Sequence, residues 1–315
     1  MFGFKTISDV QDGVRFGKAV WLTSDFLAKW LVKERVAEDI FAGSSVCIPV
    51  VERAADLLQF LARLKMLDSS ILRAAWSCSL SNDEASRLAI YQLLKDVATS
   101  LTDQELVFIF EEVDAIPPAD LQEATILFIV DLAKSSIYKA PSLALRSLEL
   151  LWNWMVDSSQ APPALARLSE TKLVELISVF GLKEQRLPLM AKCIECVARS
   201  DSVPQCLQVC WKVADSFPPK SSWTDDQTKT TAVEALQKSH DLLGAFFADF
   251  NRYKQRARKH FRTNREREKE TDKEKHAAED SVVLCSRMSH LKQVELRLNF
   301  LRFILHNSSL LLSLE

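Results

Sequence analysis

Four cysteines in the segment CIECVARSDSVPQCLQVC have a spacing that could hold a metal ion. Cys193 and Cys196 are three residues apart and Cys206 and Cys210 are four apart, so each pair would share one face of a helix. Paired thiolates are ligands that zinc uses in structural sites. The residues between them, Ile-Glu and Leu-Gln-Val, lack the glycine or tight turn usual in zinc knuckles. We therefore predict no metal and no cofactor, and four small core residues instead.

Another thiol, Cys285, stands five residues before His290, and a cysteine with a histidine could support nucleophilic catalysis. Such a nucleophile also needs an orienting Asn or Asp and backbone donors for an oxyanion, and no recognisable pattern supplies them. His240 and His306 lie on or beside helical segments, where a histidine is more often a surface or core residue than a ligand. Glycine-rich phosphate loops are also absent from the sequence. We predict no catalytic residue in this chain.

The basic stretch, residues 252–265, is the largest shift in composition along the chain. It contains no Asp or Glu and seven basic residues: Arg252, Lys254, Arg256, Arg258, Lys259, Arg262 and Arg265. It could therefore bind phosphate groups or direct nuclear import. From Glu266 onward acidic and basic residues alternate, which offsets much of this positive charge. We expect a solvated loop or helix extension, with nucleic-acid binding as the less favoured alternative.

Composition limits the classes of protein that the sequence fits. With 315 residues, 48% of them hydrophobic and 26% charged, the chain can bury a core and is expected to fold. A net charge of −2 gives no general attraction to nucleic acid or membranes. The apolar run ATILFIVDLA is interrupted by Asp131, so we predict a soluble protein without membrane contact. An odd number of cysteines, seven, and no signal sequence predict reduced thiols in the cytoplasm, or alternatively in the nucleus.

Helical patterns recur along the chain. Only six glycines occur, and the ten prolines gather in short breaks such as IPPAD and QAPPAL, which argues against a turn-rich β protein. The segment LTSDFLAKWLVKERVAEDIFAG predicts one helix, capped by Ser24 and closed by Gly43. Further caps are expected at Asp68, at Asn82 or Ser81, and at a capping box of Thr102 with Glu105.

Later helix starts are expected at Pro117–Pro118, Pro141, Pro163, Gln185, Pro204, Thr224–Gln227 and Ser289. About twelve helices then follow one another, and a pair of helices approaches the period of roughly 40 to 47 residues that HEAT and armadillo repeats show. Antiparallel helices joined by short turns must cover one another's apolar faces. The predicted fold class is therefore all-α, an armadillo/HEAT-like helical repeat solenoid of about twelve helices, with a compact bundle as the alternative.

We expect three regions: residues 1–250 as helical repeats, 251–282 as a charged flexible loop or helix extension, and 283–315 as further repeats. In the last region, helical spacing predicts a packed face made of Leu291, Val294, Leu298, Leu301 and Leu305. The final leucines have no later sequence to cover them: Leu310, Leu311, Leu312 and Leu314. We therefore expect the chain to be a fragment, cut at its C-terminus.

Two of the seven tryptophans, Trp152 and Trp154, lie in LWNWMV, a helical segment whose apolar surface is too wide for one side. We predict that both rings belong to the core of a repeat. The alternative is a site that anchors a partner protein, because exposed tryptophans are frequent binding hot spots.

Four segments in this order resemble the long N-terminal helical region of the fat-facets (FAF-X) class of ubiquitin-specific proteases: WLTSDFLAKWLVKERVAEDIF, ILRAAWSCSLSNDEASRLAIYQLLKDVATSLTDQELVFIFEEV, ALRSLELLWNWMVD and SRMSHLKQVELRLNFLRFIL. The likeness rests on apolar and tryptophan positions and runs nearly end to end. It implies an armadillo-like scaffold upstream of a catalytic domain. Its implied partners are proteins, ubiquitinated substrates and the rest of the parent protein. The charged stretch after residue 251 is longer and more basic than the family's counterpart.

The resemblance brings no catalytic residue with it. The protease domain of that class begins with a glycine- and asparagine-rich box around its nucleophilic cysteine, and neither this box nor the later histidine box surrounds any cysteine here: Cys47, Cys78, Cys193, Cys196, Cys206, Cys210 or Cys285. We therefore predict a non-catalytic scaffold segment that recruits partners or substrates for ubiquitin removal. One alternative is a cysteine-type deubiquitinase through its parent protein, and another is a nucleic-acid adaptor acting through residues 252–265.

Overall fold

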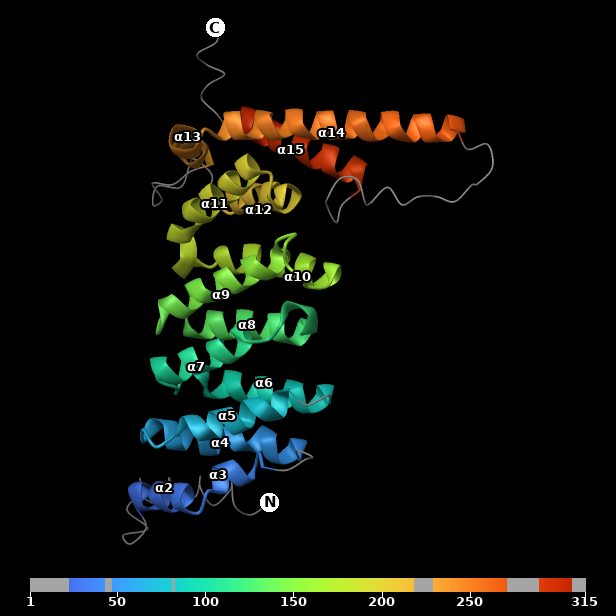
Figure 1. The fold of residues 1–315 in the computed structure, drawn as a ribbon. Helices are drawn as coiled ribbons and strands as arrows, with labels where there is room; N and C mark the ends of the chain where they lie inside the picture. The colour runs from blue at the N-terminus through green and yellow to red at the C-terminus, as the bar shows by residue number, and fades with distance from the viewer. Residues whose placement is uncertain (1–22, 43–46, 81–82, 218–228, 271–288, 308–315) are drawn as a thin grey trace. The chain divides into compact units, whose positions relative to one another are not determined.

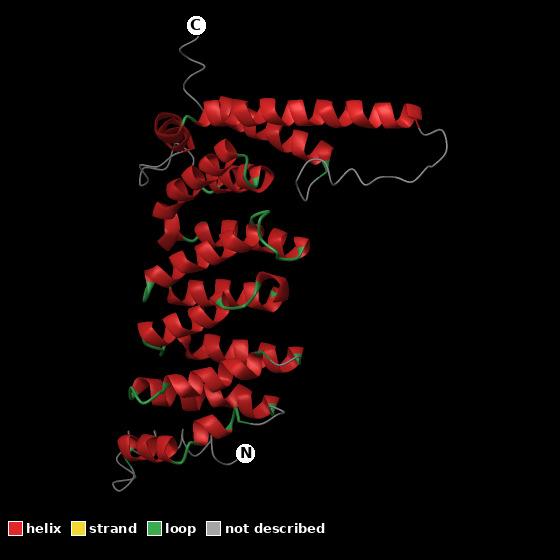
Figure 2. Ribbon diagram, viewed as in Figure 1, coloured by secondary structure: helices red, strands yellow, loops and turns green. Residues whose placement is uncertain are grey.

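The computed structural model describes residues 23–42, 47–80, 83–217, 229–270 and 289–307. Within these ranges every regular element is helical, with fourteen α-helices, two short 3-10 helices and no strand (Figures 1 and 2). The chain divides into two compact units, residues 1–150 and 151–315. The all-α prediction is therefore confirmed. None of the helices described is long and apolar enough to cross a membrane.

The first unit is a succession of helices connected by short turns (Figure 1). Its elements are α2 (Ser24–Lys33), α3 (Val36–Asp39), α4 (Ile48–Arg63), α5 (Ser69–Ser79), α6 (Glu84–Ala98), α7 (Asp103–Asp114), η1 (Pro118–Asp120) and α8 (Glu123–Ser136). Helix α6 packs against α4, α5 and α8, and α5 also packs against α7. Neighbouring helices thus cover one another's apolar faces, as a helical repeat requires.

An aromatic cluster forms the centre of this first unit. The ring of Tyr91 on α6 stacks on Phe128 of α8, with centroids 4.5 Å apart, and on Trp76 of α5, at 5.9 Å. All three side chains are buried. The Tyr91 hydroxyl lies 3.1 Å from the hydroxyl of Thr125, so its polar end has a hydrogen-bond partner, and burial raises the pKa of Tyr91. These contacts join three helices, α5, α6 and α8.

The second unit contains the remaining helices. Helix α9 (Pro141–Met155) carries the boundary, and after it come α10 (Pro163–Ile177), η2 (Phe180–Gln185), α11 (Arg186–Arg199), α12 (Val203–Asp215), α13 (Lys229–His240), α14 (Leu242–Glu270) and α15 (His290–Asn307). Helix α11 packs against α12 and α14, and α12 packs against α15. The expected starts at Pro141 and Pro163 are confirmed, and those near Gln185, Pro204 and Ser289 agree within one residue. The expected box at residues 224–227 lies outside the described residues.

Two of the predicted helix caps are confirmed. Asp68 accepts a hydrogen bond from the Ser70 amide, as expected. Thr102 and Glu105 form the predicted capping box, in which each side chain accepts from the other residue's amide. The cap of α6 was predicted wrongly. It is Asp83, because both of its carboxylate oxygens accept bonds from the first turn, and these bonds lower its pKa. Residues 81–82 lie outside the described part.

The prediction of one helix over the segment from Ser24 was wrong. Thr23, rather than Ser24, caps α2, and α2 ends at Lys33. Arg35 adopts a left-handed conformation with φ of 54°, and the short helix α3 starts after it. The Arg35 side chain forms an ion pair with Glu38 one turn later, which links the break to α3. Gly43, the expected end, lies outside the described residues.

The packed face of α15 was also predicted wrongly. Leu291, Leu298 and Leu305 are 77%, 52% and 41% exposed, respectively. The buried face instead consists of Gln293, Leu296, Arg297, Phe300, Phe303 and Ile304. The physical reason is Arg297. The sequence pattern predicts that this arginine faces solvent, but it is buried beside Asp249 of α14. The final leucines, residues 310–314, lie outside the described part.

Candidate interaction site on the second unit

Helix α14 is the longest helix described, with 29 residues, and its start is fixed by Asp241. Asp241 has a positive φ of 45°, and its carboxylate accepts a hydrogen bond from the Gly244 amide at 3.2 Å. A Cβ atom at position 244 would lie 1.9 Å from this carboxylate, so glycine permits the close approach. The helix packs against α11 and α13.

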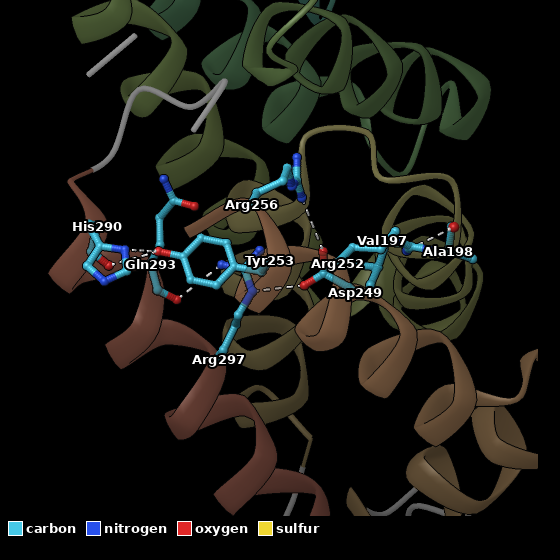
Figure 3. Close-up of polar contacts among 9 residues, drawn as sticks. All are labelled: Val197, Ala198, Asp249, Arg252, Tyr253, Arg256, His290, Gln293 and Arg297. Atoms are coloured by element: carbon cyan, nitrogen blue, oxygen red, sulfur yellow. Dashed lines mark hydrogen bonds and ion pairs between the residues drawn. The ribbon is translucent and has the colours of Figure 1, made fainter. Parts of the chain in front are cut away.

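A buried ion pair joins α14 to α15 (Figure 3). The Arg297 Nε donates to Asp249 Oδ2 at 2.8 Å, and the two side chains are 1% and 0% exposed. The Arg297 guanidinium also lies 4.0 Å from the centroid of the Tyr253 ring and donates to the Gln293 carbonyl at 3.2 Å. Asp249 Oδ1 has no hydrogen bond within the described ranges, and the Arg256 guanidinium lies 4.0 Å from it. Both charges therefore depend mainly on each other.

Tyr253 makes the second link between these helices. Its hydroxyl group lies 2.6 Å from His290 Nδ1, and its O–H donates to the His290 carbonyl at 3.2 Å (Figure 3). The two rings are nearly parallel, at 12°, with centroids 5.7 Å apart. Burial raises the pKa of Tyr253, although Arg297 acts in the opposite direction. The first turn of α15 is thus held against the middle of α14, and His290 has a structural contact here.

Part of the basic stretch has internal partners. Helix α14 continues to Glu270 and so contains all of residues 252–265. Arg252 donates to the carbonyls of Val197 and Ala198 at 3.0 and 3.1 Å, and so satisfies acceptors at the end of α11 (Figure 3). Arg256 lies beside Asp249. These two arginines contribute to packing, which their sequence context did not predict.

Other members of the basic stretch face solvent. Lys254, Arg258 and Arg262 are exposed and follow one another at intervals of four residues, so they form a row along one side of α14. Lys259 is exposed as well, and the side chain of Arg265 lies outside the described part. Nucleic-acid binding through this stretch stays a prediction.

The four clustered cysteines occupy the packed interface of α11 and α12. Cys193, Cys196, Cys206 and Cys210 are each at most 4% exposed. Burial raises the pKa of Cys193 and Cys210, and the hydrogen bond with Cys206 is the main cause of the raised pKa of Cys196. Across the described ranges, no group of three or more His, Cys, Asp or Glu residues is arranged to hold a metal ion. Cys285 lies outside these ranges.

These environments predict a sharp difference in thiol reactivity. Iodoacetamide at pH 8 is expected to modify the exposed Cys47 in the native chain, while the four cysteines of α11 and α12 stay unmodified, because the thiolate is the reactive form and theirs is suppressed. Mass spectrometry of the digested protein measures this. The same protein in guanidinium is the control, and all thiols should react there. Rapid native modification of Cys206, or exposure of the four thiols by EDTA, would contradict the assignment.

Both tryptophans of LWNWMV are buried. Trp152 is 5% and Trp154 3% exposed, and the Lys192 ammonium lies 4.5 Å from the centroid of the Trp152 ring. This cation–π contact holds α11 against the end of α9. Both rings are therefore core residues, which was the first of the two expectations for them. A role of these rings as partner anchors stays a prediction.

A groove that the sequence did not indicate opens beside α10, α12 and the start of α15. Its volume is about 460 Å³, and its lining includes Arg167 and Glu170 of α10, Gln205 and Gln208 of α12, and Lys292 of α15. The lining residues, with Met155 of α9, come from parts of the chain as distant in sequence as α9 and α15, so no local pattern could have brought them together. Glu170 gave the only local signal, as a charged residue on the otherwise buried side of α10.

Comparison with known proteins gives one family and several relatives. The family model described as UBP24/USP9X/USP9Y ARM repeat matches residues 5–315. The chain is 23% identical over 305 residues to ubiquitin carboxyl-terminal hydrolase 9X of Mus musculus, and 22% identical over 309 residues to ubiquitin carboxyl-terminal hydrolase 9Y of Homo sapiens. It is 22% identical over 299 residues to the probable ubiquitin carboxyl-terminal hydrolase FAF of Drosophila melanogaster. Each match covers 92% of this chain but only 10 or 11% of the relative.

Proposed function

This chain belongs to the UBP24/USP9X/USP9Y ARM repeat family, and from that membership we propose that it is a non-catalytic helical scaffold that recruits protein partners or substrates for ubiquitin removal. The observation that carries the proposal is the family match, which extends from residue 5 to residue 315. Membership also confirms the armadillo-like helical repeat and the resemblance to the fat-facets class. Helical repeats characteristically serve as extended binding surfaces.

The state of the described cysteines supports a non-catalytic role. A nucleophilic thiol needs access to substrate and a lowered pKa. Cys193, Cys206 and Cys210 are buried and their pKa values are raised, which is the opposite of both requirements. These thiols therefore serve packing between α11 and α12.

The relatives are named as ubiquitin carboxyl-terminal hydrolases, and the chain spans about a tenth of their length. We propose that hydrolysis in such a protein is carried out by other parts of the polypeptide, while this segment holds what is to be processed. The compartment that fits this role is the cytoplasm, with the nucleus as an alternative.

A ubiquitin probe with an electrophilic C-terminus tests the non-catalytic assignment. The purified chain is expected to form no covalent adduct, because the buried thiols of α11 and α12 have raised pKa values and are inaccessible to the probe. A cysteine deubiquitinase treated in parallel serves as the positive control. An adduct mapped to any of the seven cysteines, and lost when that cysteine is replaced by alanine, would establish the alternative of a catalytic chain.

Recruitment has a separate test in a longer polypeptide that carries the hydrolase. Removing this segment is expected to leave turnover of a ubiquitin–rhodamine substrate unchanged, since that substrate has no protein to recruit. Removal of ubiquitin from protein conjugates should become slower. Equal rates on the conjugates with and without the segment would contradict recruitment.

A further inference from the structure

The groove between α10, α12 and the start of α15 has features of a built binding site. Its volume of about 460 Å³ is in the range typical of ligand sites. Met155 and Ala166 supply buried apolar surface, while Arg167 and Lys292 are exposed at its edge. The other lining residues are polar or charged, so the groove suits a polar segment of chain better than an apolar ligand.

One residue that lines this groove has a buried polar atom without a partner in the described part of the chain. Gln205 is 5% exposed, and its Nε2 donates to Asp157 Oδ1 at 2.7 Å, which fixes the orientation of the amide. Its Oε1 is buried and accepts no hydrogen bond from any described residue. An unsatisfied buried acceptor is unfavourable, so a ligand that brings an N–H donor to this oxygen gains a bond that the chain itself does not supply.

The charges around the groove favour an anionic group. Glu170 is 3% exposed, but Lys212 Nζ lies 3.0 Å from its carboxylate and balances its charge. Burial raises the pKa of Glu170, and Lys212 opposes that rise. Arg167 and Lys292 form no ion pair with any described residue, so their positive charges remain available at the edge.

We propose that this groove binds an extended acidic segment of a partner protein. A backbone N–H of that segment donates to Gln205 Oε1, and a neighbouring Glu or Asp side chain pairs with Arg167 and Lys292. The inference rests on the proposed recruiting function and assigns it a place and a chemistry. Arg167 and Lys292 disfavour a basic segment at the same position.

A peptide fits this groove better than a nucleic acid. Phosphate oxygens could pair with Arg167 and Lys292, but they are acceptors only, so a nucleic acid would also have to turn a base N–H towards Gln205 Oε1. A peptide in an extended conformation offers both an N–H donor and a carboxylate within a few ångströms. One acidic peptide thus supplies both the N–H donor for Gln205 and the carboxylate for Arg167 and Lys292.

Fluorescence anisotropy with three labelled decapeptides tests the proposal: (Glu-Ala)5, (Gln-Ala)5 and (Lys-Ala)5. The intact chain is expected to bind (Glu-Ala)5 about five-fold more tightly than (Gln-Ala)5, as two exposed charge pairs would give, and to bind (Lys-Ala)5 most weakly. Equal affinity for the Glu and Gln peptides would overturn the proposal. Tighter binding of labelled (dT)10 that is lost in Arg167→Glu would also overturn it, in favour of nucleic acid.

Variants locate the binding. Arg167→Glu and Lys292→Glu change exposed residues. Each should lower the affinity for (Glu-Ala)5 to about the affinity for (Gln-Ala)5. Arg258→Glu on α14 makes the same change of charge away from the groove and should have no effect. Gln205→Met should weaken all three peptides by about five-fold, because it removes the acceptor.

Two results would exclude the groove as the site of peptide binding. One is an equal loss of (Glu-Ala)5 binding in Arg258→Glu and Arg167→Glu, which would mean general charge attraction. The other is full binding by Gln205→Met, provided that its circular dichroism shows an intact fold. If Gln205→Met does not fold, the two exposed variants, Arg167→Glu and Lys292→Glu, still test whether the groove binds the peptide. Failure of peptide binding would leave the ubiquitin-probe and conjugate experiments untouched, so the two proposals can fail separately.

Discussion

Replacing Arg297 by methionine is expected to lower the free energy of unfolding of the second unit by about 3 to 5 kcal/mol. The change leaves the Asp249 carboxylate fully buried without its main partner, and Arg256, at 4.0 Å, cannot replace the lost 2.8 Å bond. It also removes the guanidinium from the face of Tyr253. Urea denaturation followed by circular dichroism at 222 nm measures the effect.

Two further variants separate the buried charge from loss of volume. Arg302→Met makes the same substitution at an exposed position of α15 and should change stability by at most about 0.5 kcal/mol. The double variant Asp249→Leu with Arg297→Met should recover most of the loss, because no unpaired charge then remains. A single Arg297→Met variant as stable as Arg302→Met would show that the ion pair has no structural importance.

Replacing Trp76 by alanine is expected to destabilise the first unit by about 3 to 5 kcal/mol. Trp76 is 2% exposed and contacts both Tyr91 and Phe128, so its removal leaves a cavity among three helices, α5, α6 and α8. The surrounding rings are stacked and can fill that cavity only in part. Urea denaturation again provides the measurement.

The controls for Trp76 distinguish cavity formation from loss of apolar surface alone. Trp76→Phe retains much of the ring and should cost less than half as much as Trp76→Ala. Leu88→Ala, on α6 at a position that is 49% exposed, should be nearly neutral. A cost for Trp76→Ala similar to that of Leu88→Ala would mean that the aromatic cluster is not the centre of this unit.

The sequence was most informative where structure depends on nearby residues. The cap at Asp68 and the box of Thr102 with Glu105 follow from atoms within three positions of one another, so both could be read directly. The break at Arg35 could not, because the left-handed residue is an arginine and no glycine or proline marks the turn. Hydrophobic periodicity likewise predicted that helices would form but not where each one would stop.

The faces of the later helices depend on distant partners and were therefore less predictable. Arg297 is buried because Asp249, 48 residues earlier, lies opposite it, and this pairing turns Leu291, Leu298 and Leu305 outward. The groove around Gln205 combines α10, α12 and α15 in the same way. Periodicity treats charged residues as solvated, so it has no means of recognising a buried pair.

The bond between Asp249 and Arg297 also fixes the position of α15 along α14. If α15 were shifted along α14 by one helical turn, about 5.4 Å, both charges would remain buried but would no longer form an ion pair. Two unpaired buried charges would destabilise the fold. The position of α15 along α14 is thus set by this pairing together with the contact of Tyr253 with His290.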